Sequence, residues 1–546
     1  MARTAGFDRL LRAARTAAFC DHAGLPTDEG VEIAAAQAAR QQASRREFLA
    51  GAGATAALVA GGGALLNRPA WAAKPSSASA DIAIIGGGLA GLACAYELRR
   101  KGVGSTVYEA DTRVGGRCYS LAGAFPGQVV ELGGELIDTP HKTMLGYAKE
   151  FKLTVEDVTR GPGEQFWVLG GERVDDAEIV EEFRAFVPAI RADLQGITKG
   201  LDASAAANPV DVALDHTSLR EYLQIRGAGP TLSAALDAAY GPEFGREIDE
   251  QTCLNLLLFI HADRRSKFHE FGVFSDERYH VVGGNGQIPA RMAQALGSQV
   301  ALGHALEAIT RKASGRYALT FATAGGVVSR EADVVVLAIP FSTLRNVALD
   351  DASLGLPPWK RLAIDGLQYG TNAKMMVGMN RRTWRDHGGN GRANCLLPHA
   401  QNVWETNPSF AGPTAVLTDF AGGLRGASLN PNQVQAAAAA FLGDLDAHVF
   451  PGVWADATRA PGGAFRAVMQ HWPSHPWALG SYTCNGLGYF TTIAGNEGKS
   501  VGNLYFVGEH TDSFYDWQGF MEGAAATGGA VAGELVQRLR APAKKG

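Results

Sequence analysis

The chain has 546 residues, of which 46% are hydrophobic and 19% charged, and its formal net charge at pH 7 is −5. This length and composition are those of an ordinary globular protein with two packed domains, and they exclude a disordered tail or a repeat protein. The mildly acidic balance argues against nucleic acid as a partner, and six cysteines that fall singly, with no CxxC pair, indicate neither a metal site nor a full disulfide framework.

The first part of the chain, residues 1–72, resembles a twin-arginine export signal. Arg45 and Arg46 precede a weakly apolar run of alanine and glycine and a small-residue cleavage site in front of Ala73. The run is too rich in glycine and alanine to be a good membrane span, so we expect no stable membrane anchor after cleavage. We therefore predict export by this route to the periplasm or the extracellular space. The long stretch before the arginine pair, residues 1–43, leaves open an upstream start codon or a real extension.

A strand, a glycine turn and a helix follow in the pattern that binds a dinucleotide. The apolar run at 82–85 predicts a buried parallel strand, and a helix is expected over 89–101 directly after the turn. The unpaired N–H groups at the start of that helix favour a pyrophosphate, and the missing side chains of the turn let the backbone approach it. A second strand at 106–108 ends in Glu109, at the usual spacing of about 20 residues for a carboxylate that bonds a ribose hydroxyl. The glycines of the turn are Gly86, Gly88 and Gly91.

Two further motifs make the chain similar to the flavin amine oxidase family, which includes monoamine oxidases, polyamine oxidases and L-amino-acid oxidases. They consist of Gly115, Gly116, Arg117, Gly508 and Glu509. The resemblance implies FAD, with Arg117 supplying charge to the pyrophosphate and Glu509 bonding the ribityl chain. The backbone N–H of Met521 would face the pyrimidine ring of the flavin.

The resemblance also implies an α/β fold, with a Rossmann-like, doubly wound FAD-binding domain and a discontinuous α+β substrate-binding domain. We expect residues 73–140, 279–343 and 478–546 in the FAD-binding domain. Residues 141–278 and 344–477 then form the substrate-binding domain. The pattern from about 141 to 280 is helical and amphipathic.

More of the cofactor shell is implied by the same resemblance. One segment would run along the flavin ring, the Leu306 backbone would meet the adenine, and the segment of Trp472 would pack against the dimethylbenzene edge. Some relatives attach FAD through a cysteine where this chain has Ser481, so we expect noncovalent FAD, although Cys484 lies three residues on. The segment along the ring holds Gly133, Gly134 and Glu135.

Four side chains are candidates for the catalytic site, and Glu135 of the segment along the ring is one of them. Lys374 lies in an apolar, strand-like run, where an edge lysine is the ordinary interpretation. Its position matches the family lysine that holds a water against flavin N5, where a cation stabilises developing negative charge. Phe520 fits one wall of the aromatic cage that the family builds around the substrate nitrogen. Trp517 is a candidate for the other wall, with a core role as its alternative.

We therefore predict an FAD-dependent amine oxidase that converts a primary amine to an aldehyde, ammonia and hydrogen peroxide, with O2 as the second substrate. Glu135 fits the second ammonium of a diamine or polyamine, and a role in bonding the flavin shell is equally open. A carboxylate-binding arginine is missing near Leu136, but Arg246 or Arg264 keeps an L-amino-acid oxidase giving a 2-oxo acid as an alternative. An amine dehydrogenase with a protein acceptor and a non-enzymatic flavin-binding module are further alternatives. The sequence leaves open whether the protein is a homodimer.

Overall fold

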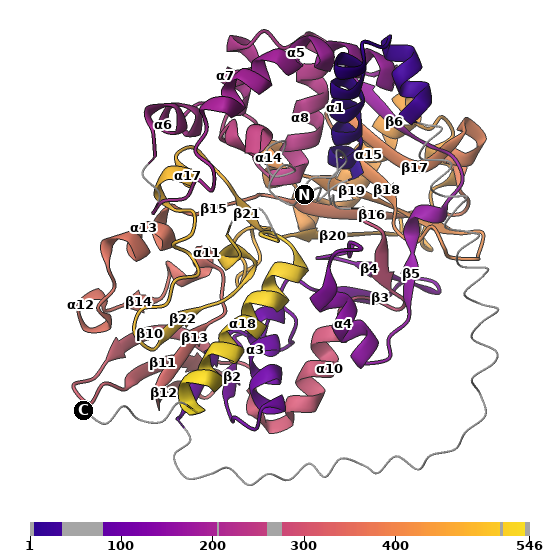
Figure 1. Ribbon diagram of the computed structural model, residues 1–546. Coiled ribbons are helices and arrows are strands. Elements are labelled where there is room, and N and C mark those ends of the chain that lie inside the picture. The colour runs from indigo at the N-terminus through magenta and orange to yellow at the C-terminus, as the bar shows by residue number, and fades with distance from the viewer. Residues whose placement is uncertain (1–4, 35–79, 205–206, 259–275, 514–516, 541–546) are drawn as a thin grey trace, which may run out of the picture.

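The computed structural model describes residues 5–34, 80–204, 207–258, 276–513 and 517–540 (Figure 1). The arginine pair, the apolar run after it and the predicted cleavage site lie outside the described residues. Within the described ranges, no helix combines the length and the apolar character that crossing a membrane requires.

A five-stranded sheet forms the centre of the part that carries the glycine turn. Its strands follow the order β22–β13–β1–β2–β9, and every neighbouring pair is parallel. Alternate side chains of β1 point to opposite faces, so Ile82 and Ile84 join one core cluster whereas Ala83 and Ile85 join another. The sheet is therefore buried on both faces, as the apolar run predicts. The strands are β1 (Ile82–Ile85), β2 (Thr106–Tyr108), β9 (Val300–Ala301), β13 (Val334–Leu337) and β22 (Leu504–Phe506).

Helices from both ends of residues 80–540 pack on one face of this sheet. The last helix, α18, lies beside α3 in Figure 1, and a Cβ at Gly528 would stand 2.2 Å from the carbonyl oxygen of Ala90. The missing side chain at Gly528 thus lets the two helices approach closely. The two strands predicted at 82–85 and 106–108 are confirmed, and the helix predicted from residue 89 ends one residue early. These helices are α3 (Leu89–Arg100), α4 (Lys142–Glu150), α10 (Gln287–Leu296) and α18 (Met521–Arg540).

A seven-stranded sheet forms the second part, in the order β20–β16–β19–β18–β17–β6–β7. It joins two strands from residues 164–174 to five strands from residues 373–471, with β6 parallel to β17. The helical pattern expected over 141–280 is therefore wrong for β5 to β7. The partners of β5 and β6 are remote in sequence, and β7 pairs with β6 as a hairpin. The strands of the sheet are β6 (Glu164–Leu169), β7 (Glu172–Val174), β16 (Ala373–Met379), β17 (Gly389–Leu396), β18 (Asn402–Glu405), β19 (Ala415–Ala421) and β20 (Ala467–His471).

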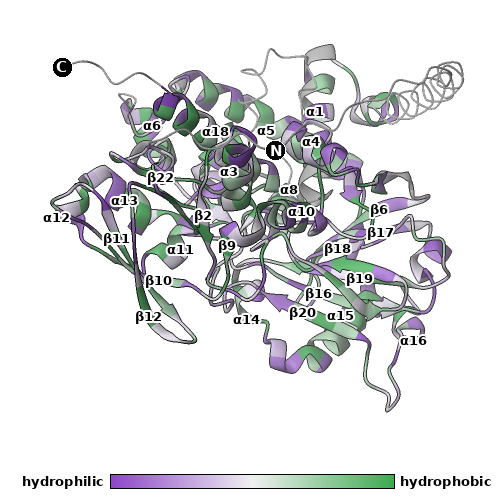
Figure 2. Cartoon of the chain, turned by 90° about the horizontal axis from the view of Figure 1, so that it is seen from below, coloured by the Kyte–Doolittle hydropathy of each residue, from purple (hydrophilic) through white to green (hydrophobic). Residues whose placement is uncertain are grey.

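One face of this large sheet is covered by α15 (Val434–His448), which contributes Phe441, Leu442 and Leu445 to the core cluster that includes Met375 and Val377 of β16. Figure 2 shows this helix beside β16, β19 and β20, with hydrophobic colour on the strands. The packing holds β16 rigidly in the sheet, between β20 and β19.

A layer of helices stands at the other end of the large sheet. Helix α1 packs against α5 and α8 in this layer (Figure 1). Asn208 begins α6 with a capping box. Its side chain accepts a hydrogen bond from the backbone N–H of Asp211, and the Asp211 side chain accepts one from the backbone N–H of Asn208. The helices of the layer are α1 (Ala5–Ala23), α5 (Asp176–Gly196), α6 (Pro209–Asp215), α7 (Leu219–Ile225) and α8 (Pro230–Phe244).

The remaining elements are short and connect the two parts. A four-stranded sheet in the order β12–β11–β10–β14 flanks the parallel sheet, and three two-stranded pairs join loops across the molecule. The strands are β3 (Ser120–Phe125), β4 (Gln128–Glu131), β5 (Val155–Asp157), β8 (Tyr279–Val281), β10 (Ala305–Arg311), β11 (Tyr317–Thr323), β12 (Gly326–Ala332), β14 (Ala348–Leu349), β15 (Gln368–Tyr369) and β21 (Thr483–Cys484). The helices are α11 (Phe341–Leu344), α12 (Asp351–Leu354), α13 (Pro358–Gly366), α14 (Gly423–Ser428), α16 (Val453–Asp456) and α17 (Tyr489–Thr492).

Candidate functional site

A cavity of about 260 Å³ runs along the carboxyl ends of the parallel strands, and we call it the nucleotide groove. Ligands of open α/β sheets bind at this edge, since the loops there are positioned by the buried strands. Most of the predicted cofactor residues line the groove although they come from distant segments. They are Gly86, Gly88, Glu109, Gly115, Gly116, Arg117, Gly134, Leu306, Trp472, Gly508, Glu509 and Met521.

The glycine turn gives the groove an unobstructed helix end. Gly88 is the N-cap of α3 and has no side chain to bond the first N–H groups, so these face the groove. Gly86 has φ +109°, which favours glycine. A Cβ at Gly91 would stand 2.0 Å from the carbonyl oxygen of Gly86, so Gly91 acts by permitting the tight turn and does not itself line the groove.

Glu109 is placed at the end of β2 by backbone contacts. It is buried, and its carboxylate accepts hydrogen bonds from the backbone N–H groups of Gly87 and Asp111. Burial raises its pKa, and the two backbone donors oppose this effect. The carboxylate therefore stands beside the glycine turn, where a ribose of the bound dinucleotide would lie.

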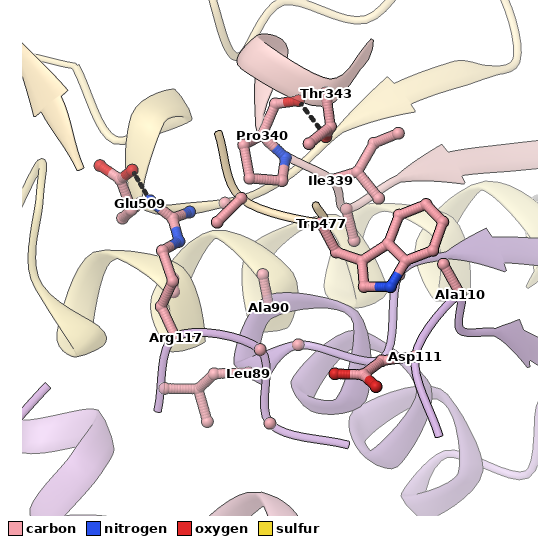
Figure 3. A pocket seen from close by; sticks show the side chains of 18 of the residues that line it. Leu89, Ala90, Ala110, Asp111, Arg117, Ile339, Pro340, Thr343, Trp477 and Glu509 are labelled. Atoms are coloured by element: carbon pink, nitrogen blue, oxygen red, sulfur yellow. Dashed lines mark hydrogen bonds and ion pairs between the residues drawn. The ribbon is translucent and has the colours of Figure 1, made fainter. Parts of the chain in front are cut away.

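The two predicted flavin motifs meet directly in the groove. The Arg117 guanidinium lies 2.7 Å from a carboxylate oxygen of Glu509 and also donates to the Ser481 carbonyl at 2.7 Å. Figure 3 shows the Arg117 and Glu509 side chains facing each other. Burial alone would raise the pKa of Glu509, but Arg117 and a hydrogen bond from Thr483 outweigh it and hold that pKa below its usual value. Glu509 is therefore ionised.

His510 gives a test of whether the groove fits a polar cofactor. The side chain is buried and lines the groove, and neither ring nitrogen has a hydrogen-bond partner among the described residues. Burial lowers its pKa to about 3, so the ring is neutral, with one nitrogen a donor and the other an acceptor. Buried polar groups are rarely left unpaired, so the groove fits a ligand with polar atoms at this point. His510 directly follows the predicted Glu509, but its place in the groove was not predicted from the sequence.

A second cavity of about 130 Å³, which we call the inner cavity, continues the nucleotide groove toward the large sheet. The residues that line both cavities form the junction, so the two spaces are continuous. These shared residues are Arg117, Gly134, Trp472, Ser481, Tyr482, Gly519, Phe520 and Met521. A ring system that leaves the groove at this junction would present its face to the inner cavity.

Lys374 and Glu135 form a buried ion pair in the wall of the inner cavity. Their side chains are 6% and 4% exposed, and Nζ lies 2.7 Å from Oε2. Lys374 also donates to the carbonyl oxygens of Glu131 and Gly133, at 3.2 and 2.8 Å. Together with Glu135, these two oxygens occupy all three N–H donors of the ammonium group. The other carboxylate oxygen of Glu135 accepts from Trp404 Nε1 at 2.8 Å. Both predicted residues are thus in the site, and each is tied to the other.

The aromatic walls of the inner cavity differ in part from those expected. Phe520 lines the cavity as predicted, but Trp517 lines neither cavity, because its ring packs edge-on against His141 at 4.7 Å. Trp404 and Phe420, from neighbouring strands β18 and β19, supply aromatic wall instead, with ring centroids 5.7 Å apart. The Lys374 Nζ lies 5.4 and 5.9 Å from those two rings.

Charged residues that the sequence analysis missed lie at the end of the inner cavity. Arg392 of β17 lines the cavity and forms no ion pair among the described residues. Asp138 and Glu277 also line it, and the Glu277 backbone N–H donates to Asp138. Arg246 does not belong to the lining, and Arg264 lies outside the described residues. No local signal could have found Arg392, since only the pairing of β17 brings it to the site.

Comparisons with known proteins agree with this geometry. A family model described as flavin containing amine oxidoreductase matches residues 89–536. An L-amino-acid oxidase from Pseudechis australis is 24% identical over 460 residues, which cover 80% of this chain and 83% of that protein.

Two solved structures share the fold. A putrescine oxidase bound to putrescine is 21% identical, with a TM-score of 0.69 over 84% of this chain and 100% of that one. Cyclohexylamine oxidase from Brevibacterium oxydans is 22% identical, with a TM-score of 0.70 over 85% and 100%. The predicted fold class, a Rossmann-like FAD-binding domain with a substrate-binding domain, is confirmed. Since the family model spans most of its length, the chain belongs to the flavin-containing amine oxidoreductases and is an FAD-dependent amine oxidase.

Proposed function

We propose that the protein oxidises a primary amine to an imine, which water hydrolyses to an aldehyde and ammonia, while the two electrons pass through FAD to O2 and yield hydrogen peroxide. The observation that carries this proposal is the continuity of the nucleotide groove with the inner cavity. A substrate in the inner cavity would lie against the cofactor with aromatic rings around it.

The chain's own residues prepare the reaction by binding and by excluding water. The rings of Trp404, Phe420 and Phe520 make a poorly solvated space, which disfavours an ammonium ion and favours the neutral amine that can be oxidised. Lys374, held by Glu135 and by two carbonyl oxygens, fixes its ammonium group in the wall of the inner cavity, where it opposes the negative charge that develops as the cofactor is reduced. Bound FAD supplies the two-electron chemistry.

The proposal includes noncovalent FAD. Ser481 stands at the junction and its hydroxyl donates to the Asn372 side chain at 2.5 Å, so no thiol lies at that position. Cys484 is fully buried and lines neither the groove nor the inner cavity. We expect acid precipitation to release all the flavin into the supernatant.

The ion pair bears on the substrate. Both carboxylate oxygens of Glu135 are occupied, by Lys374 and by Trp404, which argues against its use as the anchor for a second ammonium. Arg392 instead favours a second candidate function, the oxidation of an L-amino acid to a 2-oxo acid, since a guanidinium binds a carboxylate through two parallel hydrogen bonds. The same site would then act on a substrate with a carboxylate next to its amine.

The test is anaerobic bleaching of the flavin near 450 nm by matched pairs, such as cadaverine with L-lysine and tyramine with L-tyrosine. Bleaching by the amines, with return of colour and release of peroxide in air, supports the amine oxidase. Bleaching only by the amino acids moves the assignment to the second candidate. In that case Arg392→Met should raise the half-saturation constant for the amino acids about 100-fold. This factor corresponds to the roughly 3 kcal/mol that a hydrogen bond to a charged group contributes. Colour that returns only with an added electron carrier would identify a dehydrogenase.

Location is part of the proposal and rests on Arg45, Arg46 and the run after them, which lie outside the described residues. We propose export by the twin-arginine route, which carries folded, cofactor-loaded proteins to the far side of the membrane. Replacement of both arginines with lysine should hold the flavoprotein in the cytoplasm, and fractionation of cells would measure this. Unchanged export by that double variant would contradict the route.

A further inference from the structure

A third cavity, of about 190 Å³, lies outside the inner cavity and meets it at two charged residues. Arg392 and Glu277 line both spaces, so they form a neck between this outer cavity and the inner one. Glu277 is buried and has φ +39°, a conformation that side chains other than glycine rarely adopt. Two side chains of opposite charge therefore stand where the two cavities adjoin.

The outer cavity opens to solvent. Arg12, Thr159 and Gly161 line it and are exposed, whereas Glu277 at its inner end is buried. The nucleotide groove offers no comparable route, since the bound dinucleotide would fill it from the glycine turn to the junction. A substrate that reaches the inner cavity through the outer cavity passes the neck and does not have to displace the cofactor.

Helix α1 forms part of the wall of this outer cavity. Leu10, Ala13, Ala17 and Cys20 recur at helical spacing and are buried against α5 and α8. Arg191 of α5 forms an ion pair of 2.8 Å with Asp21, near the end of α1, and this contact supports the same placement. This docking turns Arg12 toward the outer cavity, at its rim.

Helix α1 lies outside the residues that the family model matches. The model begins at residue 89, whereas α1 spans Ala5–Ala23. Its contribution to the cavity therefore cannot be inferred from the family.

We propose that helix α1 is a wall of the substrate entrance, with Arg12 at the rim and Arg392 and Glu277 at the neck. The proposal rests on the proposed function for the identity of what passes. It gives the N-terminal extension a role in admitting substrate, and it makes the charge of the rim a determinant of which substrates enter. The other charged residues of the outer cavity are acidic: Asp276 bonds Thr139, and Glu405 is paired with Arg382.

The first experiment closes the entrance chemically. All six native cysteines are buried, so Arg12→Cys would give one accessible thiol for a maleimide carrying a polyethylene glycol chain. We expect the label to lower the apparent second-order rate constant for flavin reduction by the best substrate at least about tenfold. The limiting rate at saturating substrate should stay unchanged, because the label does not reach the reacting atoms.

The matched control is Arg291→Cys, labelled in the same way, on an exposed position of α10 that lines none of the three cavities. Its second-order rate constant should stay at the wild-type value. Equal rates for the two labelled proteins would overturn the proposal. A fall in the limiting rate or in the melting temperature of the labelled Arg12→Cys protein would indicate a structural role for α1, and would also overturn it.

A readout without turnover separates this proposal from the proposed function. If no amine or amino acid bleaches the wild-type protein, the proposed function fails, but access to the flavin can still be measured by iodide quenching of its fluorescence. We expect the labelled Arg12→Cys protein to show a smaller quenching constant than the labelled Arg291→Cys protein. Equal quenching constants would place the entrance elsewhere.

The rim charge is tested by Arg12→Glu against Arg291→Glu. Reversal at the rim should lower kcat/KM for a substrate with a carboxylate relative to one without, and the ratio should return toward the wild-type value in high salt because exposed charges are screened. The change at Arg291 should leave the ratio unaltered. A ratio that does not respond to Arg12→Glu would show that the rim does not select by charge.

Discussion

At the scale of single residues, the site is built around a buried ion pair that the sequence placed only in part. Lys374 and Glu135 were both predicted to lie at the flavin, from separate motifs, but their mutual contact of 2.7 Å follows from the meeting of β16 with the loop after β4. Each side chain supplies the counter-charge that the other needs in a space of low polarity. The pair therefore explains how a charged lysine can be buried in the wall of the inner cavity.

Glu135→Gln should lower the free energy of unfolding by about 3–5 kcal/mol, because it leaves the Lys374 ammonium buried without its counter-charge. Urea unfolding, followed by tryptophan fluorescence, would measure the loss. The double variant Glu135→Gln with Lys374→Met should recover much of it, since no buried charge remains. Asp351→Asn, which breaks the exposed pair with Arg361, is the control and should cost at most about 1 kcal/mol. A similar loss in both single variants would contradict the argument.

Glu131 should make stability depend on pH. Burial raises the pKa of this carboxyl to about 7, against the bonds from Asn285 and Ser120. The folded protein therefore binds a proton that the unfolded chain releases near pH 4.5, and the contribution of Glu131 is fully present below pH 4.5 and is lost as the pH rises to 7.

Glu131→Gln keeps a neutral side chain at every pH. Urea titrations at pH 4.5 and at pH 7 would measure the unfolding free energy of both proteins. The wild-type protein should lose unfolding free energy relative to this variant as the pH rises from 4.5 to 7. A difference that stays constant across this range would show that Glu131 is already ionised in the fold.

At the scale of elements, the glycine turn and the last helix depend on one packing contact. Helix α18 reaches α3 through Gly528, and α3 in turn presents its N-terminus to the nucleotide groove. The contact thus couples the C-terminal helix to the position of the predicted pyrophosphate site.

Gly528→Ala should destabilise the protein by about 1–3 kcal/mol, because the added carbon would stand 2.2 Å from the Ala90 carbonyl oxygen. It should also lower the ratio of flavin to protein absorbance, since α3 must move. Gly529→Ala is the matched control: its added carbon meets nothing within 4 Å, and it should stabilise the helix by up to about 1 kcal/mol. Equal effects of the two changes on flavin content would refute the coupling.

Elements with local patterns were predicted well. The strands at 82–85 and 106–108 and helix α3 follow from periodicity and from glycine chemistry, which operate within a few residues. Strands β6 and β7 were missed because β6 pairs with β17, more than 200 residues away. The same remoteness hid Arg392, Trp404 and Phe420, whose side chains meet the site only when the large sheet forms.

At the scale of the whole molecule, cofactor binding joins segments from three parts of the chain. The nucleotide groove is lined by residues from three segments, which run from Ile85 to Gly134, from His304 to Val347 and from Trp472 to Ala524. A ligand that bonds all three binds the folded state alone, so it stabilises that state. The Arg117–Glu509 contact already links the first segment to the last.

The melting temperature of protein stripped of its flavin should rise steadily with added FAD. When the FAD concentration is 100 times the dissociation constant, the free energy of unfolding should be about 2.7 kcal/mol higher. Thermal unfolding followed by circular dichroism would measure this. Arg117→Ala should reduce the rise, and riboflavin, which has no pyrophosphate, should produce little of it. A full response to riboflavin would contradict the role of the glycine turn.

The entrance also belongs to this scale, since α1 is separated from the oxidase by residues 35–79. A cut in front of Ala73 would leave α1 held by noncovalent contacts alone. We expect native mass spectrometry of the exported protein to find residues 5–34 still present, on the intact chain or as a docked fragment. Their absence would restrict the entrance wall to the uncut protein.

The sequence by itself determined the cofactor, the family and the local frame of the nucleotide site, because strand, turn, helix and acid follow one another within about 30 residues and each has a chemical reason. Tertiary structure decided which side chains surround the substrate. It paired Lys374 with Glu135, replaced Trp517 by Trp404 and Phe420, and brought Arg392 to the neck. The physical reason is that such contacts arise between strands far apart in the chain, where hydrogen-bonded register and packing, and not local pattern, fix the neighbours.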